Sequence, residues 1–169
     1  MQKLQQILEN HWYKKNNPLL CLLLLPLSGI FFLISQIRRL LYSTKVLKSF
    51  KLPIPVVIVG NISVGGVGKT PLTKYIAQEL SNLDISCGVI LRGYKSESTN
   101  ETRVVYANDD SRLVGDEALI YAQNGFKVAI GSNRYLAGKK LLEAYPNIQI
   151  ILSDDGLQHY SLIRDYEIA

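Results

Sequence analysis

The stretch Val56-Val57-Ile58-Val59-Gly60-Asn61-Ile62-Ser63-Val64-Gly65-Gly66-Val67-Gly68-Lys69-Thr70 decides the fold of this chain. Its first four residues are β-branched, which is typical of a strand buried on both faces. The glycine-rich remainder leads into a predicted helix of about three turns. The apolar residues that recur there at helical spacing are Leu72, Ile76, Leu80 and Leu83. A strand, a glycine-rich loop and a helix in this order predict a phosphate-binding loop.

The residues of this loop suit a nucleoside triphosphate for separate reasons. Glycines let backbone N–H groups converge on phosphate oxygens, and the positive end of the following helix favours an anion. Lys69 is expected to reach the β and γ oxygens, and the Thr70 hydroxyl is expected to ligate Mg²⁺. The usual pattern G-x-x-x-x-G-K-[ST] has a glycine where this chain has Ser63. The predicted ATP-binding residues are Ser63, Val64, Gly65, Gly66, Val67, Gly68, Lys69 and Thr70.

Short apolar runs alternate with helical patterns after the loop. Further strands are predicted at 87–91, 103–106, 127–130 and 148–152, and Tyr166 opens another. Helices are predicted over 116–124 and from Ser132, as N-cap, to residue 144, and a polar loop or hairpin over 95–102. This alternation predicts an α/β, P-loop NTPase-like parallel sheet with helices on both faces.

Charge is distributed unevenly along the chain. Residues 1–55 contain eight basic and one acidic side chain, whereas residues 56–169 contain eleven and thirteen. A nucleic-acid-binding domain would carry its basic surplus on the fold itself, so the charge pattern argues against that class. Cys21 and Cys87 have no CxxC or His neighbours, and we expect buried small side chains rather than a disulfide or zinc site.

A hydrophobic segment lies within the basic N-terminal part. Twenty-two uncharged residues separate Lys15 from Arg38. As a helix they would extend about 33 Å, close to the thickness of about 30 Å of a hydrocarbon core. Trp12 and Tyr42 stand where an interfacial aromatic belt would be. The segment is therefore predicted to be a membrane-anchoring helix.

The predicted domains follow from this segment. Residues 1–55 are predicted to form the membrane anchor, and residues 56–169 a P-loop nucleotide-binding domain. Pro26 and Gly29 leave a kinked or interfacial helix open, and a cleaved signal peptide is the rival interpretation. The heavier basic flank on the C-terminal side favours a cytoplasmic domain. Because the chain stops at Ala169 inside a strand pattern, we expect a fragment or a truncated form.

Carboxylates follow the predicted strand ends. The run 148–152 leads to Asp154 and Asp155, as in a Walker B element, in which an acid holds Mg²⁺ or its water. A solvated turn or a helix cap would use the same residues. Asp116 opens a helix, where capping alone would account for it. A kinase also needs a carboxylate to receive the proton of the acceptor hydroxyl, and Asp116 is the best remaining candidate.

Three further residues are weaker candidates. His159 is predicted either to hydrogen-bond a phosphate, a sugar or a neighbouring acid, or to be structural. Arg92 ends a predicted strand and Arg134 starts a predicted helix. Both arginines are predicted either to contact phosphates or to form surface ion pairs.

Several strings taken together resemble one known family. They are Gly60-Asn61 before Gly65-Gly66-Val67-Gly68-Lys69-Thr70-Pro71, Arg92-Gly93-Tyr94, Gly115-Asp116-Glu117, Asp154-Asp155-Gly156-Leu157-Gln158-His159-Tyr160 and Arg164-Asp165. Their order and spacing closely resemble the tetraacyldisaccharide 4'-kinase family of lipid A biosynthesis. The Asp-Asp-Gly-x-Gln-His-Tyr string is the most specific of them, since many unrelated enzymes share the phosphate loop.

The resemblance implies a P-loop kinase at the cytoplasmic face of the bacterial inner membrane. It implies transfer of the γ-phosphate of ATP to the 4'-hydroxyl of a tetraacylated glucosamine disaccharide 1-phosphate, which forms lipid IVA. The implied cofactors are ATP and Mg²⁺, and the implied partners are this glycolipid and the membrane surface, without nucleic acid. Family members have a second lobe that supplies a further histidine, so a chain of these residues alone is expected to turn over poorly.

The resemblance also implies roles for individual residues. Asp116 resembles the general base of the family, and Asp155 and His159 lie in its active-site motif. The residues expected to hold Mg²⁺ are Thr70, Asp154 and Asp155, and which of the two carboxylates contacts the metal is left open.

A membrane-tethered ATPase switch that acts on a protein partner is the second hypothesis. The loop also resembles that of ParA-like and MinD-like ATPases, but their signature lysine falls on Val64 in this chain. The base-reading N-K-x-D string of GTPases is absent from the sequence, which favours ATP over GTP. A kinase should phosphorylate a lipid, whereas a switch should hydrolyse ATP with water and respond to a protein.

Overall fold

The computed structural model describes residues 18–61, 69–93 and 101–169, in two compact units, Met1–Val46 and Leu47–Ala169. Part of the predicted phosphate loop lies outside the described residues. These positions are Ser63, Val64, Gly65, Gly66, Val67 and Gly68. The side chain of Lys69 also lies outside the description, so the cradle of the loop stays a prediction.

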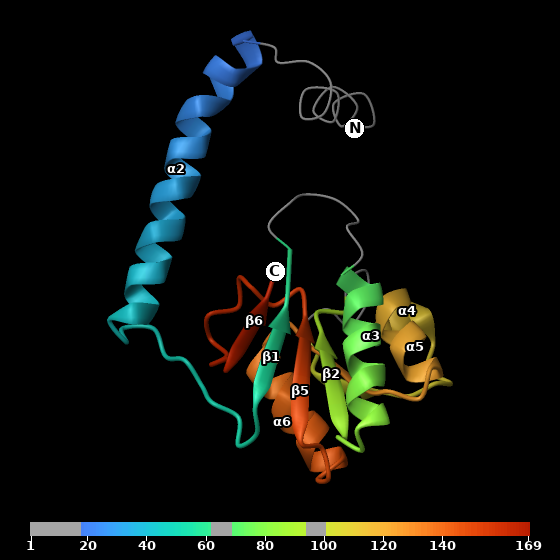
Figure 1. Cartoon of the computed structure of the whole chain (residues 1–169). Helices are drawn as coiled ribbons and strands as arrows, with labels where there is room; N and C mark the ends of the chain where they lie inside the picture. Colours follow the sequence, from blue (N-terminus) through green and yellow to red (C-terminus); the bar gives the residue numbers. More distant parts are fainter. Residues whose placement is uncertain (1–17, 62–68, 94–100) are drawn as a thin grey trace. The chain divides into compact units, whose positions relative to one another are not determined.

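The first unit contains the helix α2 (Pro18–Ser43), which continues through Pro26 (Figure 1). Within the described residues, the stretch Leu24–Ser43 is long and apolar enough to cross a membrane, and none of it is buried inside the protein. A helix therefore occupies the predicted anchor segment. Its insertion into a bilayer stays a prediction, because length and composition alone are shared with other apolar helices.

The second unit is built on a sheet whose described strands follow the order β3-β4-β2-β5-β1-β6. The strands are β1 (Val56–Val59), β2 (Cys87–Leu91), β3 (Arg103–Val105), β4 (Lys127–Ile130), β5 (Ile150–Asp154) and β6 (Tyr166–Ile168). Neighbouring strands are parallel, except that β3 runs antiparallel to β4. The predicted parallel sheet is confirmed for the other pairs of neighbouring strands, and β3 at this edge is the exception. The connection from β2 to β3 is shorter than the dozen or more residues that a parallel crossover needs.

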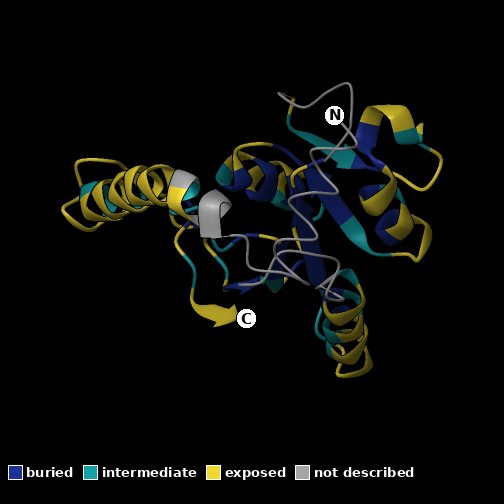
Figure 2. Cartoon of the chain, turned by 90° about the horizontal axis from the view of Figure 1, so that it is seen from above, coloured by how far each residue is buried: buried dark blue, intermediate teal, exposed yellow. Residues whose placement is uncertain are grey.

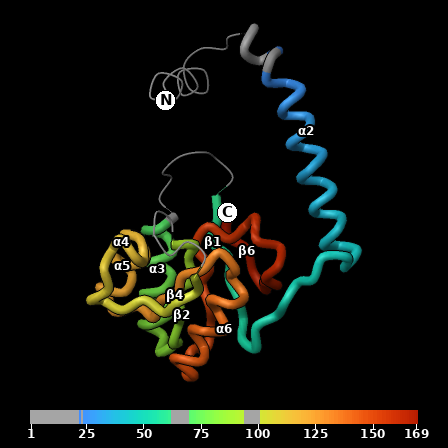
Figure 3. The backbone as a smooth tube through the Cα atoms, turned by 180° about the vertical axis from the view of Figure 1, so that it is seen from behind, coloured from blue at the N-terminus to red at the C-terminus, as the bar shows by residue number. Residues whose placement is uncertain are grey.

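Helices cover both faces of the sheet, as predicted. They are α3 (Lys69–Asn82), α4 (Ser111–Val114), α5 (Asp116–Gln123) and α6 (Arg134–Ala144). Ile58 of β1 belongs to a core cluster with Leu141 of α6, whereas Val57 belongs to one with Ala77 of α3. Figures 1 and 3, seen from opposite sides, show α3 and α6 on opposite faces of the sheet. Buried residues concentrate on the strands between these helices (Figure 2).

The bounds of β5 correct the prediction of a strand over 148–152. Ile150, rather than Ile148, pairs with Cys87 and opens the strand, while Ile148 is buried in the cluster below α6. The start of the apolar run therefore lies before the strand, where Ile148 packs in the core. As a result, Asp154 is the last residue of the strand rather than part of the following turn.

Two helix starts also differ from the prediction. Asn133, not Ser132, caps α6, because its side chain accepts a hydrogen bond from the backbone N–H of Leu136 at 3.2 Å. The helix α4 was not predicted. It is capped by Asp110, whose carboxylate accepts a hydrogen bond from the N–H of Arg112 and whose pKa is lowered by that bond. Asn and Asp residues are typical of turns as well as of helix caps, so the sequence pattern at 108–110 did not point to a helix.

Gly60, the residue directly after β1, lies against Leu157 in the turn that follows β5. A Cβ atom at Gly60 would lie 2.2 Å from Cγ and 2.4 Å from Cδ1 of Leu157. The backbone at position 60 and the Leu157 side chain therefore lie so close together that only glycine fits at this position.

We expect Gly60→Ala in the full chain to lower the free energy of unfolding by about 1–3 kcal/mol, because the added methyl group overpacks this contact. Urea denaturation in detergent measures the change. The double variant Gly60→Ala, Leu157→Ala is the control, since it removes the clashing side chain and should recover part of the loss. A single variant as stable as the wild type would contradict this contact.

Candidate nucleotide-binding site

The carboxyl ends of four strands meet at one edge of the sheet, because these strands are parallel. Val59 at the end of β1 pairs with Asp154 at the end of β5, and Leu91 at the end of β2 pairs with Ile130 at the end of β4. β2 also pairs with β5. Residues that follow these strands therefore gather at the edge where ligands bind in open α/β sheets.

A cavity of about 310 Å³ lies at this edge, and we call it the edge cavity. It is lined by Thr70, Leu91, Arg92, Glu117, Arg134, Asp154 and Asp155. It thus brings together the predicted metal ligands, from α3 and the end of β5, with both arginines that were predicted as phosphate contacts. These predicted residues therefore lie around one cavity, and their roles there stay predictions.

Asp154 is held by a tyrosine from α5. Asp154 is 4% exposed, and its Oδ2 lies 3.0 Å from the hydroxyl of Tyr121. The same hydroxyl lies 3.1 Å from the backbone carbonyl oxygen of Thr70. Burial, followed by the charge of Asp154, raises the pKa of Tyr121 far above its ordinary value, so the phenol keeps its proton. Tyr121 was not predicted, because a buried aromatic residue in a helix is ordinarily explained by core packing.

Asp155 occupies a sharp turn directly after β5. Its φ of 53° is in the left-handed region, which Asp tolerates better than most residues. Its backbone N–H donates to the carbonyl oxygen of Val59 at 2.9 Å. The turn continues through Gly156, where a Cβ atom would lie 2.6 Å from the Ser153 hydroxyl. This turn leaves Asp155 exposed and among the lining residues of the edge cavity.

Arg134 is a buried cation at the start of α6. It is 1% exposed, and its Nη1 donates to the carbonyl oxygen of Gly131 at 2.6 Å. Its Nε is buried and has no hydrogen-bond partner among the described residues. Burial lowers the pKa of Arg134 to about 10, an effect that the charge of Asp155 opposes and that of Arg92 reinforces. The side chain is therefore charged at neutral pH, and a buried charge with an unused donor fits an anionic ligand such as a phosphate.

The oxygen atoms of the edge cavity fit Mg²⁺. Carboxylates and a hydroxyl are the donor class of this ion. Among the described residues, no group of three or more His, Cys, Asp or Glu side chains stands ready to hold a metal alone. Nucleotide sites usually hold Mg²⁺ by one or two carboxylates together with substrate phosphates, so this donor set fits a metal that binds with the nucleotide.

Two predicted catalytic residues are placed differently from the others. Asp116 is the exposed first residue of α5, after Gly115 with its φ of 86°, and it does not line the edge cavity. Its neighbour Glu117 lines the edge cavity, although the sequence offered no reason to choose Glu117 over Asp116 as a site residue. His159 is half-buried in the turn after β5, where its backbone N–H donates to the carbonyl oxygen of Gly156 at 3.0 Å. The catalytic roles of Asp116 and His159 therefore stay predictions.

Comparison with known proteins supplies the family. The family model described as Tetraacyldisaccharide-1-P 4'-kinase matches residues 20–169. The chain belongs to this family. The tetraacyldisaccharide 4'-kinase of Chromobacterium violaceum is 45% identical over 164 residues, which cover 97% of this chain and 48% of that protein. Its counterpart in Actinobacillus succinogenes is 46% identical over 161 residues, which cover 95% and 49%.

A solved structure agrees with this 4'-kinase family assignment. It is described as a crystal structure of the "apo" form of LpxK from Aquifex aeolicus in complex with ATP. It matches with a TM-score of 0.79 at 36% identity, over 88% of this chain and 48% of that one. The predicted family and α/β fold are confirmed. The chain spans about half the length of the curated relatives it matches.

The family motif Arg164-Asp165 forms hydrogen bonds with backbone groups near the edge cavity. Arg164 donates from Nη1 to the carbonyl oxygen of Leu157 at 3.1 Å, and its Nε lies 2.7 Å from Glu167. Oδ2 of Asp165 accepts a hydrogen bond from the N–H of Val56 at 2.9 Å. The two side chains thus fix the turn after β5 and the start of β1.

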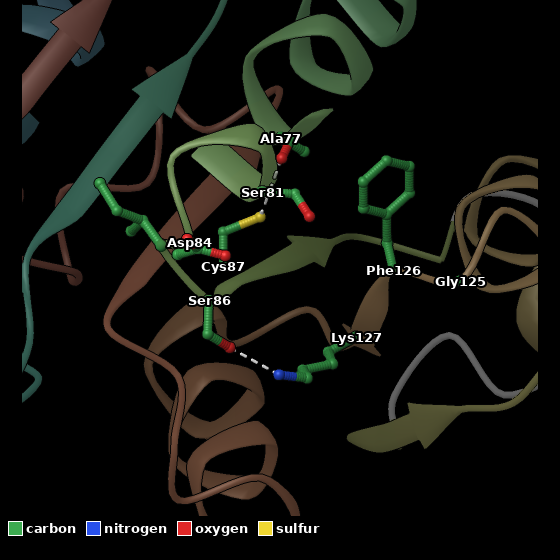
Figure 4. A pocket seen from close by; sticks show the side chains of 9 residues that line it. Ala77, Ser81, Asp84, Ser86, Cys87, Gly125, Phe126 and Lys127 are labelled. Carbon is green, nitrogen blue, oxygen red and sulfur yellow. Dashed lines mark hydrogen bonds between the residues drawn. The ribbon is translucent and has the colours of Figure 1, made fainter. Parts of the chain in front are cut away.

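A second pocket, of about 330 Å³, lies beside the first residues of β2 and β4 (Figure 4). Cys87 has a free thiol there, is 8% exposed and contacts the carbonyl oxygen of Ala77 through Sγ at 3.7 Å. Burial raises the pKa of this thiol. Figure 4 shows the amino group of Lys127 donating to the hydroxyl of Ser86. Cys87 is a buried small residue, as predicted. This pocket lies at the amino ends of the strands, whereas Asp154 lies at the carboxyl end of β5.

Proposed function

We propose that the full-length protein is an ATP-dependent lipid-sugar kinase at the cytoplasmic face of the bacterial inner membrane. Its acceptor is the 4'-hydroxyl of a tetraacyldisaccharide 1-phosphate, and its product is lipid IVA. The observation that carries this function is the edge cavity of a 4'-kinase family chain, where Thr70 and Asp154 lie with the buried cation Arg134. The ATP in the complex of the Aquifex aeolicus relative supports ATP as the donor.

Phosphoryl transfer depends on positioning the phosphates and on stabilising their charge. We assign the phosphates to the loop from Ser63 to Thr70, with Arg92 and Arg134 as further contacts. Mg²⁺, when bound, would supply positive charge that neutralises the phosphates. Its ligands from this chain would be Thr70 and the carboxylates of Asp154 and Asp155.

The acceptor oxygen would form a bond to the γ-phosphorus while the bond to the oxygen that bridges the β- and γ-phosphates breaks. ADP leaves, and the product is a phosphate monoester. The proton of the acceptor hydroxyl would pass to the carboxylate of Asp116, with Asp155 and His159 completing the catalytic set.

The partners follow from the chemistry of the acceptor. A tetraacylated sugar stays in the bilayer, so the enzyme must work at a membrane surface. The exposed apolar helix α2 and the basic surplus of residues 1–55 suit an anionic lipid surface. No role for nucleic acid follows from this charge pattern.

The decisive experiment supplies γ-labelled ATP and the tetraacyldisaccharide 1-phosphate, in detergent, to the full-length enzyme. We expect label in a bis-phosphorylated lipid, with release of ADP that depends on the lipid. A reaction without lipid is the control. If ATP binds but the label appears only in inorganic phosphate, and a protein partner accelerates that release, the protein is an ATPase switch and the kinase function is wrong.

A further inference from the structure

We propose that Tyr121 is a positioning residue that sets the magnesium dependence of nucleotide binding. Its hydroxyl bridges the first turn of α3 and the end of β5, and it thereby holds Thr70 and Asp154 in register with each other. This role rests on the proposed function, because it concerns the metal that accompanies ATP.

The hydroxyl of Tyr121 joins two segments that are far apart in the sequence. It lies 3.0 Å from Oδ2 of Asp154, which is 33 residues away, and 3.1 Å from the carbonyl oxygen of Thr70, which is 51 residues away. A phenol has a single proton, so both acceptors share one donor. The bridge thus connects the backbone of one predicted metal ligand to the side chain of the other.

The surroundings of Tyr121 fix the direction of this hydroxyl. The residue is fully buried, and its ring makes an edge contact with that of Phe126 at 6.1 Å between centroids. It lies in the same core cluster as Val89 of β2 and Val128 of β4. Because the buried ring is packed in the core, the hydroxyl acts as a fixed donor rather than as an adaptable surface group.

A donor in this position controls which way the carboxylate of Asp154 faces. Hydrogen bonds from outside the ligand set orient metal ligands, and their removal typically costs about 10–100-fold in metal affinity or activity. Without the hydroxyl, Oδ2 loses this hydrogen bond, and the carboxylate is held less firmly in the orientation in which it would meet a metal. Nucleotide contacts that do not involve the metal are not affected by this change.

The test uses Tyr121→Phe in the full-length enzyme, because phenylalanine keeps the buried ring and removes only the hydroxyl. ATP binding is titrated calorimetrically with Mg²⁺ and with a chelator. We expect equal affinity within about twofold in the chelator and a loss of about tenfold with Mg²⁺. The Mg²⁺ concentration for half-maximal binding should rise by a similar factor. Tyr145→Phe is the matched control, because Tyr145 is the C-cap residue of α6 and does not line the edge cavity.

The remaining outcomes decide against the role. Equal losses with and without Mg²⁺, unchanged Mg²⁺ titrations, or a variant that no longer folds would each make the hydroxyl a structural bond only. A second comparison removes the buried charge: Tyr121→Phe should add no further loss in an Asp154→Asn background, and additive losses would contradict a role through Asp154. These titrations need no lipid, so they separate this role from a failure of lipid phosphorylation by the wild type.

Discussion

Replacing Asp116 by asparagine in the full-length enzyme should lower kcat for lipid phosphorylation by about 10²–10⁴-fold, the usual contribution of a general base. Asparagine cannot take up the proton of the acceptor hydroxyl. ATP affinity should change by less than about twofold, because Asp116 does not line the edge cavity. Steady-state kinetics with the lipid acceptor, together with a direct ATP titration, measure the two effects separately.

Glu117→Gln is the matched control for this prediction. Glu117 is the next residue on the same helix, and it lines the edge cavity beside Asp154 and Asp155. Its substitution should weaken binding of ATP with Mg²⁺ more than it lowers kcat. If Asp116→Asn instead weakened ATP binding as much as turnover, Asp116 would be a structural residue at the start of α5. A larger loss of kcat in Glu117→Gln would move the role of base to Glu117.

Replacing Arg134 by methionine should weaken ATP binding by about 10–100-fold, the value of a hydrogen bond to a charged group. The melting temperature of the ligand-free variant should equal or exceed that of the wild type, because the buried charge disfavours folding. The pKa of Arg134 is about 10 in the folded chain against the usual 12.5. That difference corresponds to about 3 kcal/mol by which folding disfavours the charged side chain.

The sign of this effect sets its pH dependence. The folded state holds the proton of Arg134 less tightly than the unfolded chain does, so the charged side chain costs stability at neutral pH. Between pH about 10 and 12.5 the unfolded chain binds more protons, and this contribution to stability rises with pH. The methionine variant lacks this rise. Thermal melts of both proteins across that pH range, in the absence of nucleotide, measure the difference.

Arg92→Met is the comparison for the same measurements. Arg92 also lines the edge cavity but is exposed, so its loss should weaken ATP binding less. It should also leave most of the pH dependence of stability in place, because burial is the main cause of the lowered pKa of Arg134. A large loss of stability in Arg134→Met together with unchanged ATP affinity would contradict the phosphate role. It would show instead that Arg134 serves the fold by neutralising the carboxylates at the end of β5.

Local sequence patterns were enough to predict most of the strands and helices of the α/β fold. The β-branched run of β1, the glycine-rich loop and the apolar spacing of α3 each depend on neighbours in the sequence. Asp154 and Asp155 were placed at the right sheet edge because parallel strands end together. The direction of β3 was not predictable in this way, since it is decided by which strand it meets and by the length of its connection.

Features that depend on packing between distant segments were beyond the sequence. Tyr121 follows the same helical spacing as any core residue, and its link to Asp154 exists only because α5 packs beside the end of β5. Arg134 was predicted as a phosphate contact or a surface pair, and its burial could not be inferred from a helix start. The contact of Gly60 with Leu157 likewise joins two motifs that the sequence presents as separate.

The burial of Arg134 has a consequence for small-molecule inhibition. Folding has already stripped the water from this guanidinium, so an incoming anion gives up only its own hydration shell. A compact sulfonate or carboxylate compound should therefore gain more from Arg134 than from an exposed lysine. Such a compound would have no need to imitate adenine, which offers a route to selectivity over the many other enzymes that recognise ATP through its base.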